Sequence, residues 1–391
     1  YTPPAHDLRT DSFTYKLEES TGLQSEEVLV FITNPTEAPS NFSITPYLGN
    51  GAINNINVGL NLGEGGLVLI KSLSNDASNR WYWFDTHRGT GAYFRSDHYA
   101  EGTTTVLSQF TTAGFELSGD DLGLNTAGKL YLSLSFKEAP GFFDIASHYS
   151  PYQVSSVYPH RLNAEPGMVV TKGRQVNAIG KIWHKEGAAP GSIGNFFGAL
   201  QHPAFEITEY GRKSPSSNQY WLDEHSSVNS FGKEYVVYLF ANAPDKGMNF
   251  IDYTGTGANG VIATLPFRPD FMIRKTTAIW HNWMSNVFAM GGDKEVNFGA
   301  TSPGYFDNDE PNLTYRWITE LNDNGEVVSN ALNASSHQIA MNRAGERYLL
   351  MAFSETEHPQ APRVLPANIY AKHDQYTVPY NEPSALSVVD N

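Results

Sequence analysis

The chain has no cysteine among its 391 residues, few charged residues (17%) and no long apolar run. Without cysteine it forms no disulfide, no thiolate metal site and no cysteine nucleophile. No stretch approaches the roughly 18 apolar residues that span a membrane as a helix, so we expect no membrane insertion. The net charge is −15 and no Lys/Arg run is present. This argues against nucleic-acid binding, because neutralising phosphates needs a basic face.

Glycine (34 residues), proline (22 residues) and aromatic residues (13%) are abundant instead. Such a composition is typical of short strands joined by many turns. The apolar fraction of 40% is enough to form hydrophobic cores. No apolar stripe of helical period continues for a dozen residues, although 144–149 and 196–201 leave room for short helices. The sequence therefore predicts an all-β protein.

One pattern, N-x-x-G-x-x-Y-x-x-x-x-F, occurs three times, with its first residues 104 and 113 residues apart. Asn and Gly tolerate positive φ, so the pattern predicts a turn followed by a strand. The spacing of five places Tyr and Phe on opposite faces of that strand, which predicts two different packing surfaces. The motif positions are Asn125, Gly128, Tyr131 and Phe136; Asn229, Gly232, Tyr235 and Phe240; and Asn342, Gly345, Tyr348 and Phe353.

A second element precedes each copy and consists of Gly or Asp, four mostly apolar residues and Lys, at 66–71, 167–172 and 270–275. Tryptophans follow it within about a dozen residues, namely Trp81, Trp83, Trp183, Trp280 and Trp283. Aromatic rings can stack on sugars, which makes these the candidate binding residues. Their recurrence after the same strand in every copy favours core packing over ligand binding.

These elements predict three tandem β-sandwich or jelly-roll-like domains of about 100 residues each, at 41–139, 140–244 and 245–357. The middle segments lengthen along the chain, as loops tolerate, so recognition is expected there. Residues 1–40 are interpreted as the last part of an immunoglobulin-like domain, with a hairpin of two strands. Residues 358–391 hold five prolines, which disfavour a central strand and predict an extended arm along its own domain or a neighbouring subunit. Because the chain begins with Tyr1, we expect a segment of a longer protein.

Three loop motifs have alternative interpretations. The run from Gly255 to Gly260 fits G-x-G-x-x-G, but no helix follows it, so a hairpin turn is favoured over a dinucleotide site. The first repeat has Gly49 and Gly51 in the same place. The acidic run 307–310 has the oxygen ligands that Ca²⁺ prefers but lacks the spacing of a calcium loop, which favours a solvated loop. The run 322–326 predicts another hairpin turn.

Two pairs of adjacent carboxylates are candidates for glycoside hydrolysis, Asp223 with Glu224 and Asp309 with Glu310. Adjacent acids on a strand point to opposite faces, so neither pair is well arranged for it. The 12 histidines show no metal-binding spacing. We therefore expect no enzyme, with no catalytic residue, metal or cofactor.

Three features carry a resemblance to a known family. They are the Tyr-rich openings with a Gly-x-Gly turn at 47–51 and 253–257, the Pro-Asp-Phe-Met-Ile-Arg-Lys strand at 269–275, and the Y-x-x-x-x-F strands. Over residues 42–357 the repeat resembles an uncharacterised domain that occurs in tandem in tail and fibre proteins of phages, particularly marine ones. The second copy departs most, because its opening at 144–150 has lost the Gly-x-Gly turn. Residues 11–32 are similar to the closing strands of cadherin-like or immunoglobulin-like domains of bacterial and phage surface proteins.

The resemblance implies a structural virion protein, a tail fibre or related appendage that is extracellular and binds a host receptor such as a glycan. It also implies a homo-oligomer, most often a trimer, in contact with other virion proteins. It supplies no catalytic residues. Two alternatives remain open: a bacterial cell-surface adhesin or extracellular filament subunit, which strand exchange by the arm would suit, and a glycan-degrading tail enzyme.

Overall fold

A computed structural model of the chain describes part of it in detail. The described residues are 10–15, 28–33, 41–72, 80–96, 98, 101–150, 156–174, 180–187, 198–199, 214–222, 229–258, 260–267, 269–277, 284–287, 295–297, 315–321, 327–334, 342–355, 368–370 and 375–377. Among them strands dominate, no α-helix occurs, and no helix could cross a membrane. The expected all-β class is therefore confirmed.

Two compact units divide the chain, and each is described by itself. The larger unit comprises 39–288 and 292–360 and so holds all three repeats, whereas the smaller comprises 1–38, 289–291 and 361–391. In the smaller unit, β1 (Thr10–Tyr15) and β2 (Val28–Thr33) pair antiparallel, as the hairpin prediction requires. The arm adds β27 (Asn368–Tyr370) and β28 (Gln375–Thr377), in the order β1-β2-β27-β28. β27 is thus an inner strand, contrary to expectation. An inner strand is possible here because the chain has no proline between Pro366 and Pro379.

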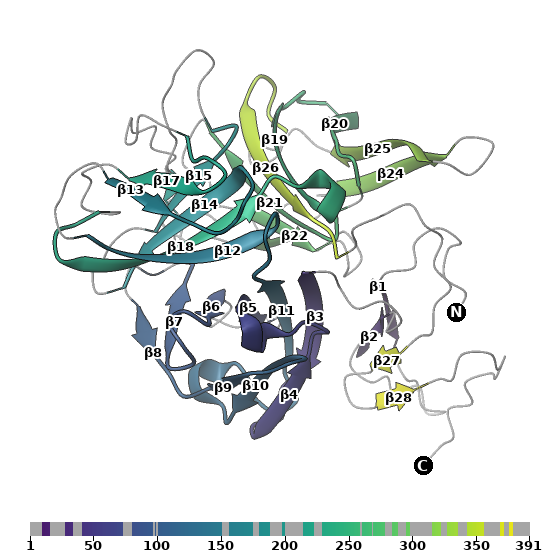
Figure 1. Ribbon diagram of the computed structural model, residues 1–391. Coiled ribbons are helices and arrows are strands. Elements are labelled where there is room, and N and C mark those ends of the chain that lie inside the picture. Colours follow the sequence, from purple (N-terminus) through teal and green to yellow (C-terminus); the bar gives the residue numbers. More distant parts are fainter. Residues whose placement is uncertain are drawn as a thin grey trace, which may run out of the picture. The chain divides into compact units, whose positions relative to one another are not determined.

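The three repeats share one plan, in which a larger antiparallel sheet is accompanied by a smaller one (Figure 1). The first repeat comprises β3 (Phe42–Leu48), β4 (Ile53–Asn57), η1 (Leu62–Glu64), β5 (Gly66–Ser72), β6 (Tyr82–Asp85), β7 (Ala92–Arg95), β8 (Gly102–Thr103), β9 (Leu107–Phe110), β10 (Gly114–Ser118), η2 (Asp121–Gly123) and β11 (Leu130–Lys137). Its larger sheet has the order β3-β11-β5-β6-β7-β8 and its smaller sheet β4-β10-β9. The closing strand β11 therefore lies between the first strand and the lysine-bearing strand.

The other repeats follow the same order with shorter sheets. The second comprises β12 (Phe143–Ser150), β13 (Ser156–Pro159), β14 (Pro166–Gly173), β15 (Lys181–His184), β16 (Gly198–Ala199), β17 (Gln219–Leu222) and β18 (Lys233–Ala241). The third comprises η3 (Pro244–Lys246), β19 (Met248–Thr254), β20 (Gly260–Thr264), β21 (Phe271–Thr276), β22 (Met284–Val287), β23 (Glu295–Asn297), β24 (Tyr315–Leu321), β25 (Val327–Ala334) and β26 (Arg347–Phe353). Their sheets are β12-β18-β14-β15-β16 with β13-β17, and β19-β26-β21-β22-β23 with β20-β25-β24. Residues 144–149 lie within β12, so the short helix considered there is wrong, whereas 196–201 are described only at 198–199, as β16.

The closing motif is a turn held by its own asparagine and tyrosine. Gly128, Gly232 and Gly345 all have φ between 68° and 78°, a conformation that glycine adopts without steric cost. The hydroxyl of Tyr131 accepts the N–H of Thr126 at 3.0 Å. The same bond recurs in the second repeat at 2.8 Å and in the third at 3.0 Å. The motif spacing therefore repeats because the strand tyrosine closes the turn that precedes it.

The motif tyrosine also stacks on the first strand of its own repeat, on the face toward the smaller sheet. Tyr131 lies on Tyr47 with ring centroids 5.1 Å apart, and Tyr348 lies on Tyr253 at 4.9 Å. In the second repeat His148 takes the place of the first-strand tyrosine, at 4.9 Å from Tyr235. Tyr131 belongs to the core that includes Phe115 of the smaller sheet, whereas Phe136 does not. The prediction that Tyr and Phe serve two packing surfaces is confirmed.

The Gly-x-Gly turns are turns, but they do not close hairpins. β3 and β4 belong to different sheets, as do β19 and β20, so each turn carries the chain from one sheet to the other. The reason is the close approach of the closing turn: the side chain of Asn125 accepts the N–H of Asn50 at 3.1 Å, and Gly51 donates to the Asn125 carbonyl at 2.6 Å. These bonds replace the pairing that a hairpin would make. By contrast, β24 and β25 do pair antiparallel, although the turn itself at 322–326 lies outside the described residues.

Replacing Gly49 by alanine is expected to destabilise the first repeat by more than about 2 kcal/mol, in the range of strained or overpacked sites. A Cβ at Gly49 would lie 2.3 Å from the Thr126 carbonyl oxygen, which belongs to the backbone and cannot turn aside. Urea denaturation followed by tryptophan fluorescence measures the loss. Gly91→Ala is the matched control, since nothing lies within 4 Å of its Cβ position. Equal midpoints for the two variants would contradict the proposed close approach.

Candidate functional site

The three motif phenylalanines meet one another, although each comes from a different repeat. The ring centroids of Phe136 and Phe240 are 5.2 Å apart, those of Phe136 and Phe353 are 5.6 Å apart, and those of Phe240 and Phe353 are 6.1 Å apart. All three pairs are edge-to-face, the arrangement that aromatic quadrupoles favour. Each ring is at most 2% exposed. We call these three rings the aromatic triad; it makes one common core from three repeated sheets.

A polar contact closes each junction around the triad, always from the second residue after the motif phenylalanine. A Glu138 carboxylate oxygen accepts the N–H of Ile145 at 3.0 Å, and the Asn242 amide oxygen accepts that of Phe250 at 3.1 Å. Glu355 accepts the N–H of Ile44 at 2.7 Å. The accepting side chains thus link repeat one to two, two to three, and three back to one. We call them the three closing contacts.

The closing contacts supply acceptors to backbone N–H groups of buried edge-strand residues. β3, β12 and β19 are all edge strands of their sheets, and an edge strand presents N–H groups that its own sheet leaves unpaired. Because each closing side chain covers the edge strand of the next repeat, the three repeats form a closed cycle. The third-to-first contact is reinforced by the rings of Phe42 and Phe353, whose centroids are 5.8 Å apart.

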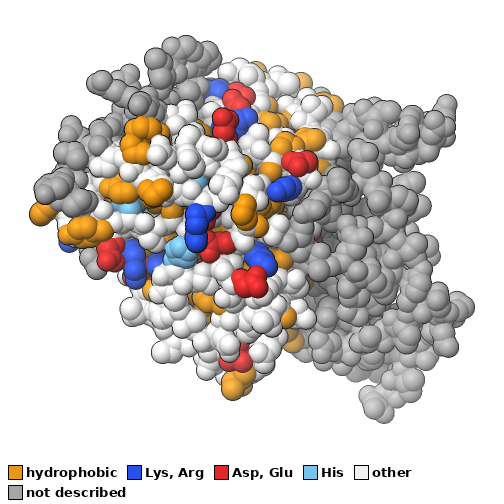
Figure 2. Space-filling view, in the orientation of Figure 1, with side chains coloured by type: hydrophobic (Ala, Val, Ile, Leu, Met, Phe, Trp, Pro, Cys, Tyr) orange, Lys and Arg blue, Asp and Glu red, His pale blue; other side chains and the backbone are white. Residues whose placement is uncertain are grey.

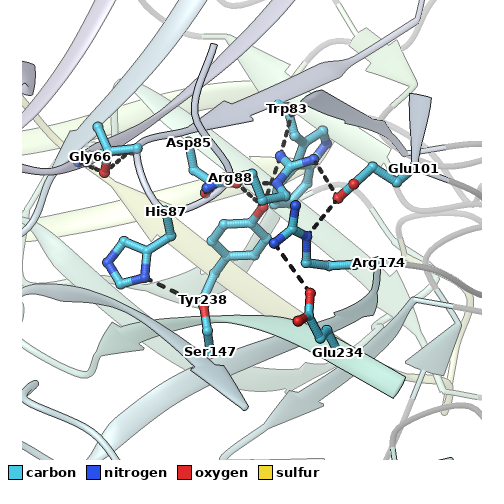
Figure 3. Close-up of polar contacts among 11 residues, drawn as sticks. Gly66, Trp83, Asp85, His87, Arg88, Glu101, Ser147, Arg174, Glu234 and Tyr238 are labelled. Atoms are coloured by element: carbon cyan, nitrogen blue, oxygen red, sulfur yellow. Dashed lines mark hydrogen bonds and ion pairs between the residues drawn. The ribbon is translucent and has the colours of Figure 1, made fainter. Parts of the chain in front are cut away.

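The junction between the first and second repeats carries a further set of charged side chains (Figure 3). We call this set the charged seam; it consists of Asp85, Arg88, Glu101, Lys172, Arg174, Glu234 and Tyr238. Arg88 is the central member, with its Nε 2.5 Å from Asp85 and a side chain only 1% exposed. The Tyr238 hydroxyl, from the second repeat, donates to Asp85 at 2.8 Å and accepts from Arg88 at 3.2 Å.

Burial and neighbouring charges shift the pKa values of Arg88 and Tyr238 in opposite directions. Burial lowers the pKa of Arg88, but Asp85 above all outweighs this effect and the pKa is raised. Burial raises the pKa of Tyr238 well above its ordinary value, although the Arg88 charge opposes the shift. Arg88 is therefore cationic and Tyr238 neutral, which is the pairing that their hydrogen bonds require.

The outer part of the seam alternates in charge across the two repeats. Arg174 lies 3.2 Å from Glu101 of the first repeat and 3.5 Å from Glu234. The Lys172 ammonium donates to the His98 carbonyl and lies over the Phe94 ring, 5.4 Å from its centroid. Burial, with a contribution from Arg88, lowers the pKa of Lys172 to about 7. The two arginines thus face three carboxylates, an arrangement suited to holding the repeats together.

A second group of titratable side chains lies at the same junction. We call His87, Glu138, Asp144 and Arg161 the carboxyl cluster. His87 is 3.5 Å from Glu138, and the Arg161 guanidinium lies 3.6 Å from Glu138 and 3.8 Å from Asp144. The Glu138 and Asp144 carboxyls also lie in contact with each other. Carboxyls that cleave a glycosidic bond stand about 5 Å or more apart, so this pair is too close for that chemistry.

Of the five tryptophans predicted as candidate binding residues, the structure describes three, and all three are buried. Trp81, Trp83 and Trp183 are 1%, 3% and 6% exposed, so they are not placed to stack on a sugar at the surface. Trp83 instead packs against Tyr238 of the second repeat, with centroids 5.5 Å apart, and Trp81 against Phe271 of the third at 6.2 Å. This burial fits the core interpretation. Trp280 and Trp283 lie outside the described residues.

The other predicted sites fall where the structure gives no description. Asp223, Glu224, Asp309, Glu310 and the acidic run 307–310 are all outside the described residues. Within the described part of the chain, no group of three or more His, Asp or Glu side chains is arranged to hold a metal ion.

One surface feature was missed in the sequence and is specific to the second repeat. Tyr149 and Phe231 are 56% and 65% exposed. Phe231 belongs to the closing turn, and Tyr149 of β12 lies beside that turn, with its hydroxyl 3.8 Å from the Cβ position of Gly232. The pairing registers and the motif give Leu48 and Ala127 as the equivalent residues of the first repeat. Aligning the three copies on the motif would have revealed this pair of aromatic substitutions.

A family model described as a domain of unknown function (DUF7483) matches residues 38–359. No curated protein and no solved structure matches the chain. The matched span contains all three repeats, the aromatic triad and the closing contacts, and it follows the boundary of the larger compact unit. The chain therefore belongs to the DUF7483 family.

Proposed function

We propose that the chain is a structural protein of a phage tail fibre or related virion appendage, and that it also attaches to a host-surface glycan. The observation that carries the structural part is the closed cycle of three repeats around the aromatic triad. Core and charged contacts both join repeats: Trp83, Arg88 and Tyr238 connect the first repeat to the second. Such a body holds its three repeats in one fixed arrangement, which suits a structural role. The partners are further copies of the chain, as a homotrimer, and other virion proteins.

The resemblance to phage tail and fibre proteins supports the location. The residues that carry it are those that build the common core: Tyr131 closes its turn, Phe136 enters the triad, and Phe271 packs on Trp81. The resemblance therefore concerns the architecture and not an isolated loop.

The attachment part rests on Tyr149 and Phe231. Figure 2 shows basic and acidic side chains set among one another on the visible face, with hydrophobic side chains between them. A face of mixed charge offers little long-range attraction for a charged receptor. Exposed aromatic rings, in contrast, present a flat apolar surface with a polar edge, which suits contact with a sugar ring. We assign the second repeat the attachment role because the other repeats lack these rings.

Immunogold electron microscopy tests the location. Antibodies raised against the chain are expected to label the tail appendages of intact phage particles, and light scattering of the released appendage should give three copies per assembly. Label on bacterial cell surfaces or on secreted filaments, with none on particles, would support the adhesin or filament alternative instead.

The double variant Tyr149→Leu/Phe231→Ala is expected to bind host cells about tenfold more weakly, as follows from losing two ring contacts of about 0.7 kcal/mol each. Binding of fluorescently labelled protein to cells or purified host polysaccharide gives the measurement. The variant should fold normally because Leu and Ala occupy these positions in the first repeat. Leu48→Ala, at the equivalent exposed position of that repeat, is the control. Unchanged binding of the double variant would remove the second repeat from the attachment surface.

A further inference from the structure

The three closing contacts have the same geometry but different chemistry. Between the first and second repeats the acceptor is Glu138, within the carboxyl cluster, whereas between the second and third it is the neutral amide of Asn242. Two carboxyls and an imidazole thus surround the Ile145 N–H contact. The Phe250 N–H contact is made by a group that does not titrate. The chain therefore contains one junction whose closing acceptor titrates and a matched one whose closing acceptor does not.

His87 is surrounded by charged groups of both repeats. Glu138 and Asp85 face it from the first repeat and Arg161 from the second. Its Nδ1 lies 3.5 Å from the Ser147 hydroxyl of the second repeat, and Asp144 is bound to Glu138. Protonation of His87 converts its 3.5 Å contact with Glu138 into an ion pair. That ion pair would fix the carboxylate that accepts the Ile145 N–H.

We propose that the carboxyl cluster is a pH-dependent latch that tightens the junction between the first and second repeats at mildly acidic pH and relaxes it at alkaline pH. At low pH the imidazolium of His87, 3.5 Å from Glu138, holds that carboxylate in place. At high pH both carboxyls are ionised side by side and His87 is neutral, so the only charged side chain of the cluster that opposes their repulsion is Arg161, which is 76% exposed. The junction between the second and third repeats does not respond through this route.

The direction of this pH dependence follows from the pKa shifts of the individual groups. The hydrogen bond to Glu138 raises the pKa of His87 above 6.5 despite burial, so its stabilising contribution is complete below that value and is lost as the pH rises through the folded-state pKa. Burial raises the pKa of Asp144 above 3.8, with help from the Glu138 charge, so its contribution is also lost as the pH rises. Burial opposes the shift at Glu138, but the His87 hydrogen bond lowers its pKa below 4.5. The Glu138 contribution is therefore lost only in stronger acid.

Other histidines would obscure this effect in a global stability curve. Burial lowers the pKa of His184 to about 3 and also lowers the pKa of His160. Both residues cost stability as the pH falls below 6.5, which is opposite in sign to the latch. A test therefore needs a measurement at the junction itself.

Amide-resolved hydrogen exchange supplies that measurement on the intact chain. Protection factors, corrected for the intrinsic pH dependence of exchange, are compared at pH 5.5 and pH 8.5. We expect the Ile145 amide to lose protection at least about fivefold at the higher pH, while the Phe250 amide changes less than twofold. Equal changes at the two amides would overturn the proposal.

Two variants separate titration from simple loss of a contact. Glu138→Gln retains an oxygen that can accept the Ile145 N–H but cannot ionise, so Ile145 should keep its protection and lose its pH dependence. His87→Gln should flatten the response between pH 6 and 8, and it remains informative if Glu138→Gln does not fold. In Glu138→Gln the His87 pKa, followed by NMR of the labelled imidazole, should fall toward 6.5. A pH dependence of Ile145 that persists in both variants would place its origin elsewhere.

Discussion

Replacing Phe136 by alanine is expected to lower the free energy of unfolding of the larger unit by about 3–5 kcal/mol, as for other large-to-small changes in well-packed cores. Phe136 is 2% exposed. It contacts Phe240 and Phe353 within the triad and also Phe143, at 5.7 Å, on the first strand of the second repeat. Truncation would leave a cavity that no single repeat can fill, because its walls belong to three different sheets. The loss should therefore affect all three repeats together.

Urea denaturation, followed by both tryptophan fluorescence and circular dichroism, measures the effect. The matched control is Phe231→Ala, which removes the same ring from a position that is 65% exposed and should shift the stability by no more than about 0.5 kcal/mol. If Phe136→Ala cost less than about 1 kcal/mol, the three repeats would be stable separately and the triad would not form their common core.

The architecture of the repeats could be predicted because its determinants recur. The turn glycines, the tyrosine that closes the turn and the phenylalanine on the opposite face keep the same spacing in every copy, since backbone geometry imposes it. The sequence did not predict that the phenylalanines meet. A fixed spacing specifies which face a residue occupies, but not which partner covers that face.

The closing contacts could also have been predicted by comparing the three repeats. Glu138, Asn242 and Glu355 differ in identity but all lie two residues after the motif phenylalanine, and all carry an acceptor oxygen. Comparing the three repeats by the chemical type of this residue, and not by its identity, would have predicted the same hydrogen-bonding role in each repeat. The sequence predicts hairpins at the Gly-x-Gly turns because short glycine turns usually join paired strands. Here the contact with Asn125 directs the chain to the second sheet.

The charged seam could not be found in this way, because its central ion pair, Asp85 with Arg88, does not recur among the described residues of the other repeats. The pairing registers place His184 of the second repeat at the position of Asp85. That histidine, held by the Leu350 carbonyl at 3.3 Å, joins the second repeat to the third by a neutral contact. A feature that occurs once offers no internal comparison, and the distance of about 150 residues between Arg88 and Tyr238 hides their contact.

Removing one member of the buried ion pair is expected to destabilise the larger unit about as strongly as truncating Phe136. Asp85→Ala should lower the free energy of unfolding by about 3–5 kcal/mol, because it leaves the Arg88 guanidinium buried without its main counter-charge. Asp85 also accepts from Tyr238, so the same change leaves a buried hydroxyl of the second repeat without an acceptor. The measurement is the shift in urea midpoint. The control is Glu234→Gln, which alters the 46% exposed end of the seam and should cost less than about 1 kcal/mol.

The triple variant Asp85→Leu/Arg88→Met/Tyr238→Phe distinguishes stability from specificity. Replacing a buried ion pair by apolar groups of similar size is often neutral or stabilising, so this variant should recover most of the loss. If it does, the seam is retained because it fixes which faces of the first two repeats meet, and exchange at the Ile145 amide should become faster although the midpoint recovers. A triple variant as unstable as Asp85→Ala would instead mean that the ion pair itself stabilises the junction, with a favourable net contribution that outweighs the desolvation of both charges.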